Sequence, residues 1–277
     1  MKVNSYAKIN LALDITGERS DGYHNIDTIM NLIDLKDVMD IRENYTGDLK
    51  LSCDNPNFPT DQSNIIYKVF KEVKKIRDIE KGFDIAVSKN IPIAAGLAGG
   101  SSNGCEFLLA IDEILDLQLS DDEIFEVCKK VGADLYYFTS KKTVRARGIG
   151  NELEELSPFG EKNILIVNNS KAVSSKTVYE NLKIYGSGIG NLCDMINRKD
   201  YGSFYKKTYN IMEGVTFKML PELKDIKNEI LNLGADYALM SGSGPTIFGL
   251  FEDDLLFDRA YRQIKDKYEY VFKTKTI

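Results

Sequence analysis

Alternating apolar and polar positions near the start of the chain predict a β-strand. The apolar positions are every second residue, at Ile9, Leu11, Leu13 and Ile15. Because successive side chains of a strand point to opposite faces, this pattern is typical of a strand with one buried face. Lys8 and Asn10 would project side by side from the other face. Such a pair also fits a solvent-exposed face, so the strand alone assigns it no chemistry.

Helical and strand patterns alternate along the rest of the chain. Apolar residues at helical spacing predict helices near 63–76, 107–115, 174–182, 189–196, 205–217 and 221–234, with a last helix ending near 264. A capping box at Ser120–Glu123 predicts a further helix that ends at Gly132. Short strands are expected at 38–41, 49–53, 83–87, 143–150, 164–167, 237–240, 247–251 and 268–272. Strands in hairpin-like groups with helices between them favour an α+β fold with mainly antiparallel sheets.

A stretch of small residues stands between a predicted strand and a predicted helix. It runs from Ile91 to Asn103 and reads IPIAAGLAGGSSN. Glycine lets a backbone approach a ligand closely, and the first turn of a helix offers unpaired N–H groups and a positive dipole end to an anion. Ser101, Ser102 and Asn103 can cap such a helix. The loop has neither the Walker A ending nor the dinucleotide-binding glycine spacing, so it fits a surface turn as well as a phosphate site.

Composition and charge narrow the class of protein. The chain has 277 residues, 43% of them hydrophobic and 28% charged, which is typical of a globular protein with a sizeable core. A net charge of −6 argues against a general nucleic-acid-binding protein. No apolar run is long enough to span a membrane and no signal-peptide core follows the first residues, so we expect a cytoplasmic protein. The four cysteines form no Cys-x-x-Cys pair, and the single histidine, His24, excludes a histidine-rich metal site.

Three separated motifs together resemble those of the GHMP kinases, the family of galacto-, homoserine, mevalonate and phosphomevalonate kinases. The motifs read AKINL at 7–11, PIAAGLAGGSSN at 92–103 and SGSGPT at 241–246. Further family-like pieces are TGERSDGYH at 16–24, GAD at 132–134, RGIG at 147–150 and VSSKTVY at 173–179. They cover nearly the whole chain in the expected order. One such motif carries little information, whereas the ordered set is specific.

The resemblance implies a two-domain α+β fold with an active-site cleft between the domains. Pro158 and Gly160 interrupt the pattern, so we expect an N-terminal domain at 1–157 with the loop and the catalytic residues, and a C-terminal domain at 158–277 on the substrate side. Members of the family transfer the γ-phosphoryl group of ATP to a hydroxyl. The implied acceptor is a small molecule with a cytidine diphosphate group, used in isoprenoid precursor biosynthesis. Mg²⁺ is expected with the nucleotide, although no clustered acidic residues announce protein ligands for it.

The resemblance also implies roles for individual residues. Lys8 and Asp134 match the catalytic pair, with Asp134 as base for the attacking hydroxyl and Lys8 orienting it and balancing charge. The matching nucleotide-binding residues are Asn64, near the adenine, and Pro92, Ala94, Ala95, Gly96, Leu97, Ala98, Gly99, Gly100, Ser101 and Ser102, around the phosphates. The implied substrate-binding residues are Asn10, Gly242 and Ser243 at the phosphate side and Tyr23, His24 and Tyr179 around the cytosine ring.

The chain departs from the family pattern beside these residues. Tyr6 stands where the family has proline, and Tyr136 and Lys141-Lys142 replace a proline and a Gly-Gly turn. Because glycine adopts φ > 0 easily and lysine does not, we expect the backbone near Asp134 to differ. Two alternatives therefore stay open: a kinase for another polyol or sugar phosphate, and a nucleotide-binding protein without catalysis. We expect no nucleic-acid or membrane partner, and a monomer or weak homodimer.

Overall fold

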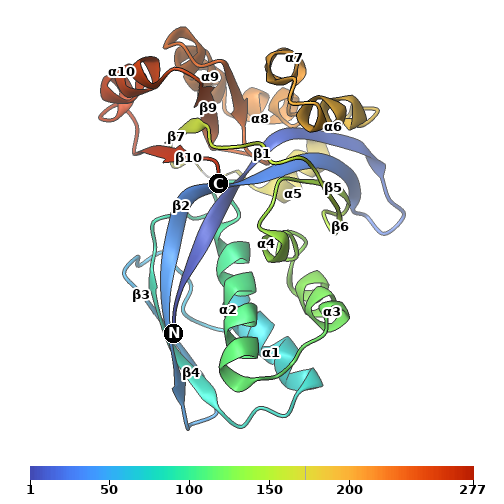
Figure 1. The fold of residues 1–277 in the computed structure, drawn as a ribbon, viewed down its shortest axis with the longest axis vertical. Helices are drawn as coiled ribbons and strands as arrows, with labels where there is room; N and C mark the ends of the chain where they lie inside the picture. Colours follow the sequence, from blue (N-terminus) through green and yellow to red (C-terminus); the bar gives the residue numbers. More distant parts are fainter. Residues whose placement is uncertain (172) are drawn as a thin grey trace. The chain divides into compact units, whose positions relative to one another are not determined.

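The computed structural model describes residues 1–171 and 173–277, shown in Figure 1. Contacts between residues divide the chain into two units, neither of which is continuous in sequence. Unit 1 comprises Met1–Ala7, Leu35–Ile93 and Ala98–Lys141, and unit 2 comprises Lys8–Asp34, Ala94–Leu97 and Lys142–Ile277. The chain passes from one unit to the other within its two longest strands, β1 (Lys2–Glu18) and β2 (His24–Asn44), which pair with each other.

β1 and β2 differ from their sequence-based descriptions. The alternation in β1 predicted one solvent-facing side, and this is wrong: Lys8 is 4% exposed and Asn10 3%. These polar side chains are buried because they bond to each other and to neighbouring elements, which no local pattern reveals. The short strand predicted at 38–41 belongs to the continuous β2, because Asp37, which looks like a break, is itself buried and hydrogen-bonded.

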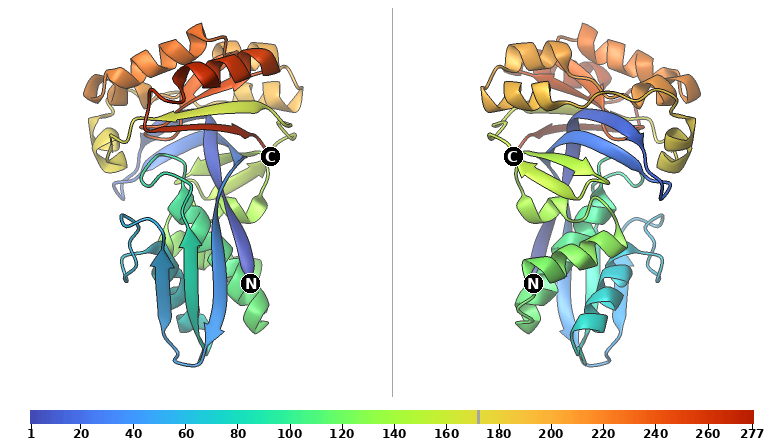
Figure 2. Two further views of the ribbon diagram at one scale, coloured as in Figure 1. Left: turned by 90° about the vertical axis from the view of Figure 1, so that its left-hand side faces the viewer. Right: turned by 90° about the vertical axis from the view of Figure 1, so that its right-hand side faces the viewer.

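Unit 1 packs helices against a small sheet. β3 (Leu49–Cys53) pairs in parallel with β4 (Gly82–Ser88), which pairs antiparallel with Val38–Asn44 of β2. α1 (Ile65–Ile76) and α2 (Gly99–Leu115) lie on one face of these strands (Figure 2), and α3 (Asp121–Val131) and the short α4 (Tyr137–Ser140) complete the unit. Three core rings meet edge to face, with centroids 5.8, 6.2 and 5.9 Å apart: Phe70, Phe83 and Phe107.

Unit 2 contains two strand ladders. β5 (Val144–Gly148) pairs antiparallel with Ile26–Met30 of β2 and with β6 (Glu152–Glu155), a strand that its charged sequence did not predict. An antiparallel sheet has the order β10 (Tyr270–Lys275), β7 (Asn163–Asn168), β9 (Ile247–Phe251) and β8 (Tyr237–Met240). α9 (Glu222–Asn232) and α10 (Asp254–Ile264) cover one face of it (Figure 2). The α+β class with mainly antiparallel sheets is confirmed.

The remaining helices of unit 2 correct one prediction. They are α5 (Ser175–Asn181), α6 (Gly190–Asn197), α7 (Tyr201–Lys207) and α8 (Glu213–Met219). A single helix predicted at 205–217 is wrong, because the chain between α7 and α8 pairs with β1. The Leu13 N–H donates to Tyr209 O at 2.9 Å, and the Ile211 N–H donates to Leu13 O at 2.9 Å. In residues 1–171 and 173–277, every helix lacks the length or the apolar character needed to cross a bilayer.

Candidate active site

Three motifs from distant parts of the sequence meet within unit 2. Lys8 Nζ donates to Asn10 Oδ1 at 2.7 Å and to Gly96 O at 3.4 Å. Ser241 Oγ donates to Gly96 O at 2.9 Å. The same oxygen accepts from the backbone N–H of Asn10 at 3.4 Å. Asn10 Nδ2 in turn donates to Thr28 Oγ1 at 2.8 Å. The lysine is therefore held with a defined direction by the loop carbonyl and the asparagine, and Ser241 and Thr28 are members of this group that sequence reasoning missed.

Glycine is required where the loop meets the third motif. Gly96 has φ 76°, and a Cβ at this position would overlap the carbonyl oxygen of Ser241. Gly242 also lies in the left-handed region, at φ 58°, which favours glycine. A Cβ on Gly242 would lie 3.5 Å from Gly96 O. Ser243 is buried, and its hydroxyl lies 2.7 Å from that of Ser175. The close approach of these two backbones explains why both motifs are rich in glycine.

The first turn of α2 lacks the features that normally satisfy a helix N-terminus. Its N-cap is Ala98, in the left-handed region at φ 54°, with no side-chain hydrogen bond and no acidic residue in the first turn. The prediction that Ser101, Ser102 and Asn103 cap this helix is wrong, since the helix begins at Gly99 and includes all three. First-turn N–H groups that the N-cap side chain leaves unsatisfied, at the positive end of a 17-residue helix, are groups of the kind that bind an anion.

Other atoms of the loop fit a polar ligand. The hydroxyl oxygen of Ser102 is buried and has no hydrogen-bond partner among the residues that the structure describes. Gly100 is exposed, Ala95 and Leu97 are buried, Pro92 is partly buried, and Ala94 is exposed with φ 53°. A buried unpaired hydroxyl costs free energy unless a ligand or water satisfies it, so Ser102 suits a bound phosphate oxygen or the shell of its metal ion. Across the described part of the chain, no cluster of His, Cys, Asp and Glu could hold a metal ion.

An aromatic group forms a second part of the site in unit 2. His24 stacks on Tyr179 with ring centroids 5.0 Å apart and an interplanar angle of 29°. Tyr185 lies at 6.1 Å from the same imidazole and was not predicted. Tyr23 is 61% exposed. Two of the three residues expected around a nucleobase are therefore in contact, and Tyr185 extends them.

Two buried carboxylates fix the segment that follows Tyr185. Asp14 Oδ2 accepts from the Gly188 N–H at 2.8 Å. Asp27 forms a bidentate pair with Arg145 at 2.8 Å for both bonds and accepts from the Ile189 N–H at 3.0 Å. The hydrogen bonds and charge of Asp27 raise the pKa of Arg145 above its ordinary value. Single acidic residues in β-strands gave no sequence signal for this role.

Asp134 lies in unit 1, just after the C-cap of α3 at Gly132, and is partly exposed. Burial, and then the charge of Asp134, raise the pKa of Tyr137 well above its ordinary value. Lys141 takes φ 51°, a left-handed conformation that glycine adopts more easily, and its ammonium pairs with Glu106 at 2.9 Å. The premise that lysine would avoid φ > 0 is therefore wrong at Lys141, and a backbone near Asp134 that differs from that of the family stays a prediction.

Asn64 has a local structural role as the N-cap of α1. Its Oδ1 accepts from the Ile66 N–H at 2.9 Å and its Nδ2 donates to Pro59 O at 2.6 Å. The start of α1 also lies against the start of α2, because a Cβ on Gly100 would be 3.5 Å from Ile65 Cδ1. An adenine contact by Asn64 stays a prediction.

Comparison with known proteins decides the family. The model of the GHMP kinases N terminal domain matches residues 64–142, and that of the GHMP kinases C terminal domain matches residues 192–269. This chain belongs to the GHMP kinase family. Family membership makes it an ATP-dependent small-molecule kinase and explains why the loop, Lys8 and Ser241 lie together.

Full-length relatives narrow the comparison within the GHMP kinases. The chain is 57% identical to the 4-diphosphocytidyl-2-C-methyl-D-erythritol kinase of Finegoldia magna, with all of both chains covered. It is 37% identical to the enzyme of that name from Clostridium beijerinckii, again over the whole of both. A crystal structure of 4-(cytidine 5'-diphospho)-2C-methyl-D-erythritol kinase matches with TM-score 0.85 and 26% identity, covering 100% and 99% of the chains. The fold is shared with homoserine kinase from Cytophaga hutchinsonii, whose structure matches with TM-score 0.76 and 17% identity. This match covers 100% of this chain and 94% of the homoserine kinase chain.

Proposed function

We propose that this GHMP kinase transfers the γ-phosphoryl group of ATP to the 2-hydroxyl of 4-diphosphocytidyl-2-C-methyl-D-erythritol, in isoprenoid precursor biosynthesis. The observation that carries the proposal is the stacked pair of His24 and Tyr179, with Tyr185 beside it, in a chain that is 57% identical throughout to a relative named for this substrate. Ring stacking on a base is worth about 1–3 kcal/mol per base in nucleic-acid-binding proteins. Tyr23, His24 and Tyr179 would hold the cytosine ring, and Asn10, Gly242 and Ser243 would contact the phosphate side.

The nucleotide belongs on the glycine loop in this proposal. Residues 92 and 94–102 would surround the ATP phosphates, with backbone N–H groups of the first turn of α2 as donors. Asn64 would lie near the adenine. Mg²⁺ bound to the nucleotide would neutralise phosphate charge, and the unpartnered hydroxyl of Ser102 is a suitable group to meet a phosphate oxygen or a metal-bound water.

Lys8 and Asp134 would carry out the chemistry. Phosphoryl transfer depends mainly on positioning and on stabilising charge on the transferring group. Asp134 would accept the proton of the acceptor hydroxyl, and Lys8 would orient that hydroxyl and balance the developing charge. The bonds from Lys8 to Asn10 and Gly96 support this role, because they hold the ammonium in a defined direction beside the loop.

The proposal also includes the organisation expected from sequence. The segment 1–157 would form the N-terminal domain with the loop and the catalytic residues, and 158–277 the C-terminal domain on the substrate side. The enzyme would act in the cytoplasm as a monomer or weak homodimer, on a small molecule with a cytidine diphosphate group and without a nucleic-acid or membrane partner.

An acceptor panel tests the substrate. ADP release is measured with 4-diphosphocytidyl-2-C-methyl-D-erythritol, mevalonate, homoserine, galactose and a sugar phosphate at equal concentrations. We expect turnover with the cytidine diphosphate compound alone, and a higher acceptor KM with unchanged ATP KM in His24→Ala. Turnover of a different acceptor would replace the substrate while keeping the kinase. Calorimetric nucleotide binding with no turnover of any acceptor would indicate a protein that binds nucleotide without catalysis.

A further inference from the structure

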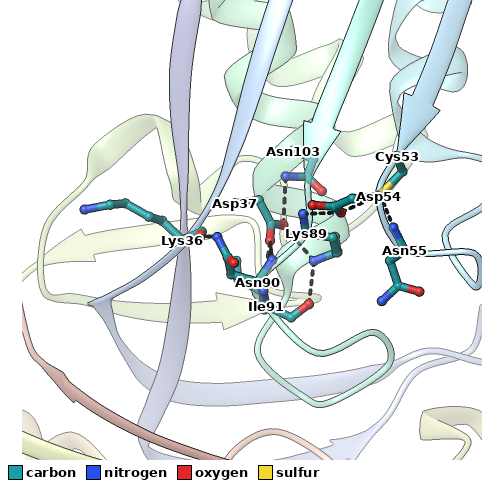
Figure 3. A network of polar contacts seen from close by, with 9 residues as sticks. All are labelled: Lys36, Asp37, Cys53, Asp54, Asn55, Lys89, Asn90, Ile91 and Asn103. Atoms are coloured by element: carbon teal, nitrogen blue, oxygen red, sulfur yellow. Dashed lines mark hydrogen bonds and ion pairs between the residues drawn. The ribbon is translucent and has the colours of Figure 1, made fainter.

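A buried carboxylate in unit 1 collects hydrogen bonds from both sides of the glycine loop (Figure 3). Asp37 is fully buried, and its Oδ1 accepts from the N–H groups of Asn90 at 2.8 Å and Ile91 at 2.9 Å. Its Oδ2 accepts from Asn103 Nδ2 at 3.1 Å and pairs with Lys89 Nζ at 2.6 Å. Asn90 and Ile91 stand at the start of the 91–103 stretch, and Asn103, its last residue, lies in α2. One side chain therefore joins the two ends of the loop.

Lys89 adds a second connection between the same two ends. Its Nζ donates to Ile91 O at 2.6 Å, and its side chain is only 3% exposed. A Cβ on Gly99 would lie 3.1 Å from this Nζ and 2.9 Å from Ile91 Cγ2. The ammonium thus packs beside the first residue of α2, a position that glycine leaves open. Burial lowers the pKa of Lys89, and the charge and hydrogen bond of Asp37 oppose this shift.

The loop between these ends has a backbone that needs support. Ala94 and Ala98 lie in the left-handed region at φ 53° and 54°, and Gly96 lies there at φ 76°. Non-glycine residues hold such conformations only where the surrounding structure fixes them, and they concentrate at ligand-binding sites. The Asp37 network supplies fixed points on either side of this strained segment.

We propose that Asp37 and Lys89 are positioning residues that hold the two ends of the phosphate loop and thereby set the affinity for ATP. The inference rests on the proposed assignment of the loop to the ATP phosphates. Asp37 and Lys89 lie outside the family motifs quoted above, and the positioning of the loop gives a physical reason for their burial. Neither side chain needs to touch the nucleotide.

A purely structural role makes a different prediction. Removing one partner of a buried ion pair is destabilising, because it leaves the other charge buried and unpaired. If that were the whole role, Asp37→Asn would lower the melting temperature and leave ATP affinity unchanged in the folded protein. Loop positioning instead predicts weaker nucleotide binding in protein that is still folded, with the acceptor KM unaffected.

The test compares two carboxylate-to-amide variants in unit 1. Asp37→Asn changes the loop network, whereas Glu123→Gln changes a more exposed ion pair of the same unit, in which Arg77 lies 2.6 Å from Glu123 at the start of α3. The readouts are KM and kcat for ATP, acceptor KM, calorimetric ADP affinity and melting temperature. We expect Asp37→Asn to raise the ATP KM and the ADP Kd about tenfold or more, because buried hydrogen bonds to the loop are lost. Glu123→Gln should leave both within about twofold, because its partners are outside the loop.

Two further variants keep every outcome decisive. Gly100→Asp places a carboxylate in the first turn of α2, and ADP binding that survives this change contradicts the loop assignment itself. ADP binding lost in Gly100→Asp but unchanged in folded Asp37→Asn overturns the positioning role alone. If Asp37→Asn does not fold, Asn103→Ala decides, since it removes one donor and keeps the buried ion pair. An ATP KM raised about threefold then supports the proposal, and an unchanged KM refutes it.

Discussion

The N-termini of α2 and α3, both in unit 1, are built in opposite ways. α3 begins with a complete capping box, in which Ser120 Oγ accepts from the Glu123 N–H and Glu123 Oε2 accepts from the Ser120 N–H, and its first turn holds three acidic residues. α2 begins after a left-handed alanine, with no side-chain cap and no acidic residue. The first arrangement satisfies the helix from within the chain, and the second leaves its N–H groups and dipole available to an anion.

The difference shows where each helix obtains its stability. α2 starts with Gly99 and Gly100, which are poor helix formers, yet Gly104 approaches α1 so closely that a Cβ would overlap the Ile65 side chain. Phe107 and Ile111 are fully buried in the core of unit 1. α3 has only two buried residues and depends more on its cap and its charges. Packing thus stabilises α2 and frees its first turn for binding.

The largest expected effect concerns Asp134, which follows the far end of α3. We expect Asp134→Asn to lower kcat by about 10²–10⁴-fold, the contribution of a positioned general base, while ADP affinity changes by less than about twofold. Single-turnover kinetics and calorimetry measure the two quantities separately. A kcat near the wild-type value would contradict the role of Asp134. A loss of ADP affinity as large as the loss of kcat would contradict the separation of roles, in which the start of α2 binds the nucleotide and Asp134, after α3, acts in the chemical step.

A smaller effect is expected at the α3 cap. Ser120→Ala removes the acceptor for the Glu123 N–H and should destabilise the protein by about 0.5–2 kcal/mol. The ATP KM should stay unchanged, because this helix start is closed by its own side chains. Urea denaturation and steady-state kinetics on the same preparation test both statements. An altered ATP KM would mean that the α3 N-terminus also contributes to nucleotide binding.

The smallest effect is a pH dependence at the same cap. Hydrogen bonds from Arg77 and the Ser120 N–H lower the pKa of Glu123 from its ordinary value to about 2. The folded state therefore binds fewer protons than the unfolded state, so this carboxylate adds stability above about pH 4.5 and loses the effect as pH falls through about 2. The difference in urea midpoint between wild type and Glu123→Gln should shrink from pH 6 to pH 3. A constant difference would contradict this account.

The sequence predicted those features that local patterns encode. The Ser120–Glu123 capping box, the end of α3 at Gly132, the strand–loop–helix order around Gly96 and the α+β class are all confirmed. The ordered motifs indicated the family, and the structure brings Lys8, Gly96 and Ser241 of these motifs into contact. Roles of individual site residues, including Asp134 and Asn64, stay predictions.

The features that sequence reasoning missed depend on long-range contacts. The alternation in β1 predicted one exposed face, but Asn10 is buried beside Thr28 and Ser241, and Asp14 is buried with a bond from Gly188. The helix predicted at 205–217 is interrupted because its middle pairs with Leu13. Asp37 and Lys89 belong to none of the recognised motifs, and they come into contact with the loop ends only when β2, the end of β4 and α2 pack together. No periodicity or spacing of residues signals such groups.

A crystal structure with a non-hydrolysable ATP analogue and Mg²⁺ tests the central claim most directly, namely that the uncapped start of α2 binds the ATP phosphates. We predict phosphate oxygens within hydrogen-bond distance of the backbone N–H groups of Gly99, Gly100 and Ser101, with the Ser102 hydroxyl satisfied by the nucleotide or by the water shell of its metal. A bound analogue whose phosphates contact none of these groups would contradict the account.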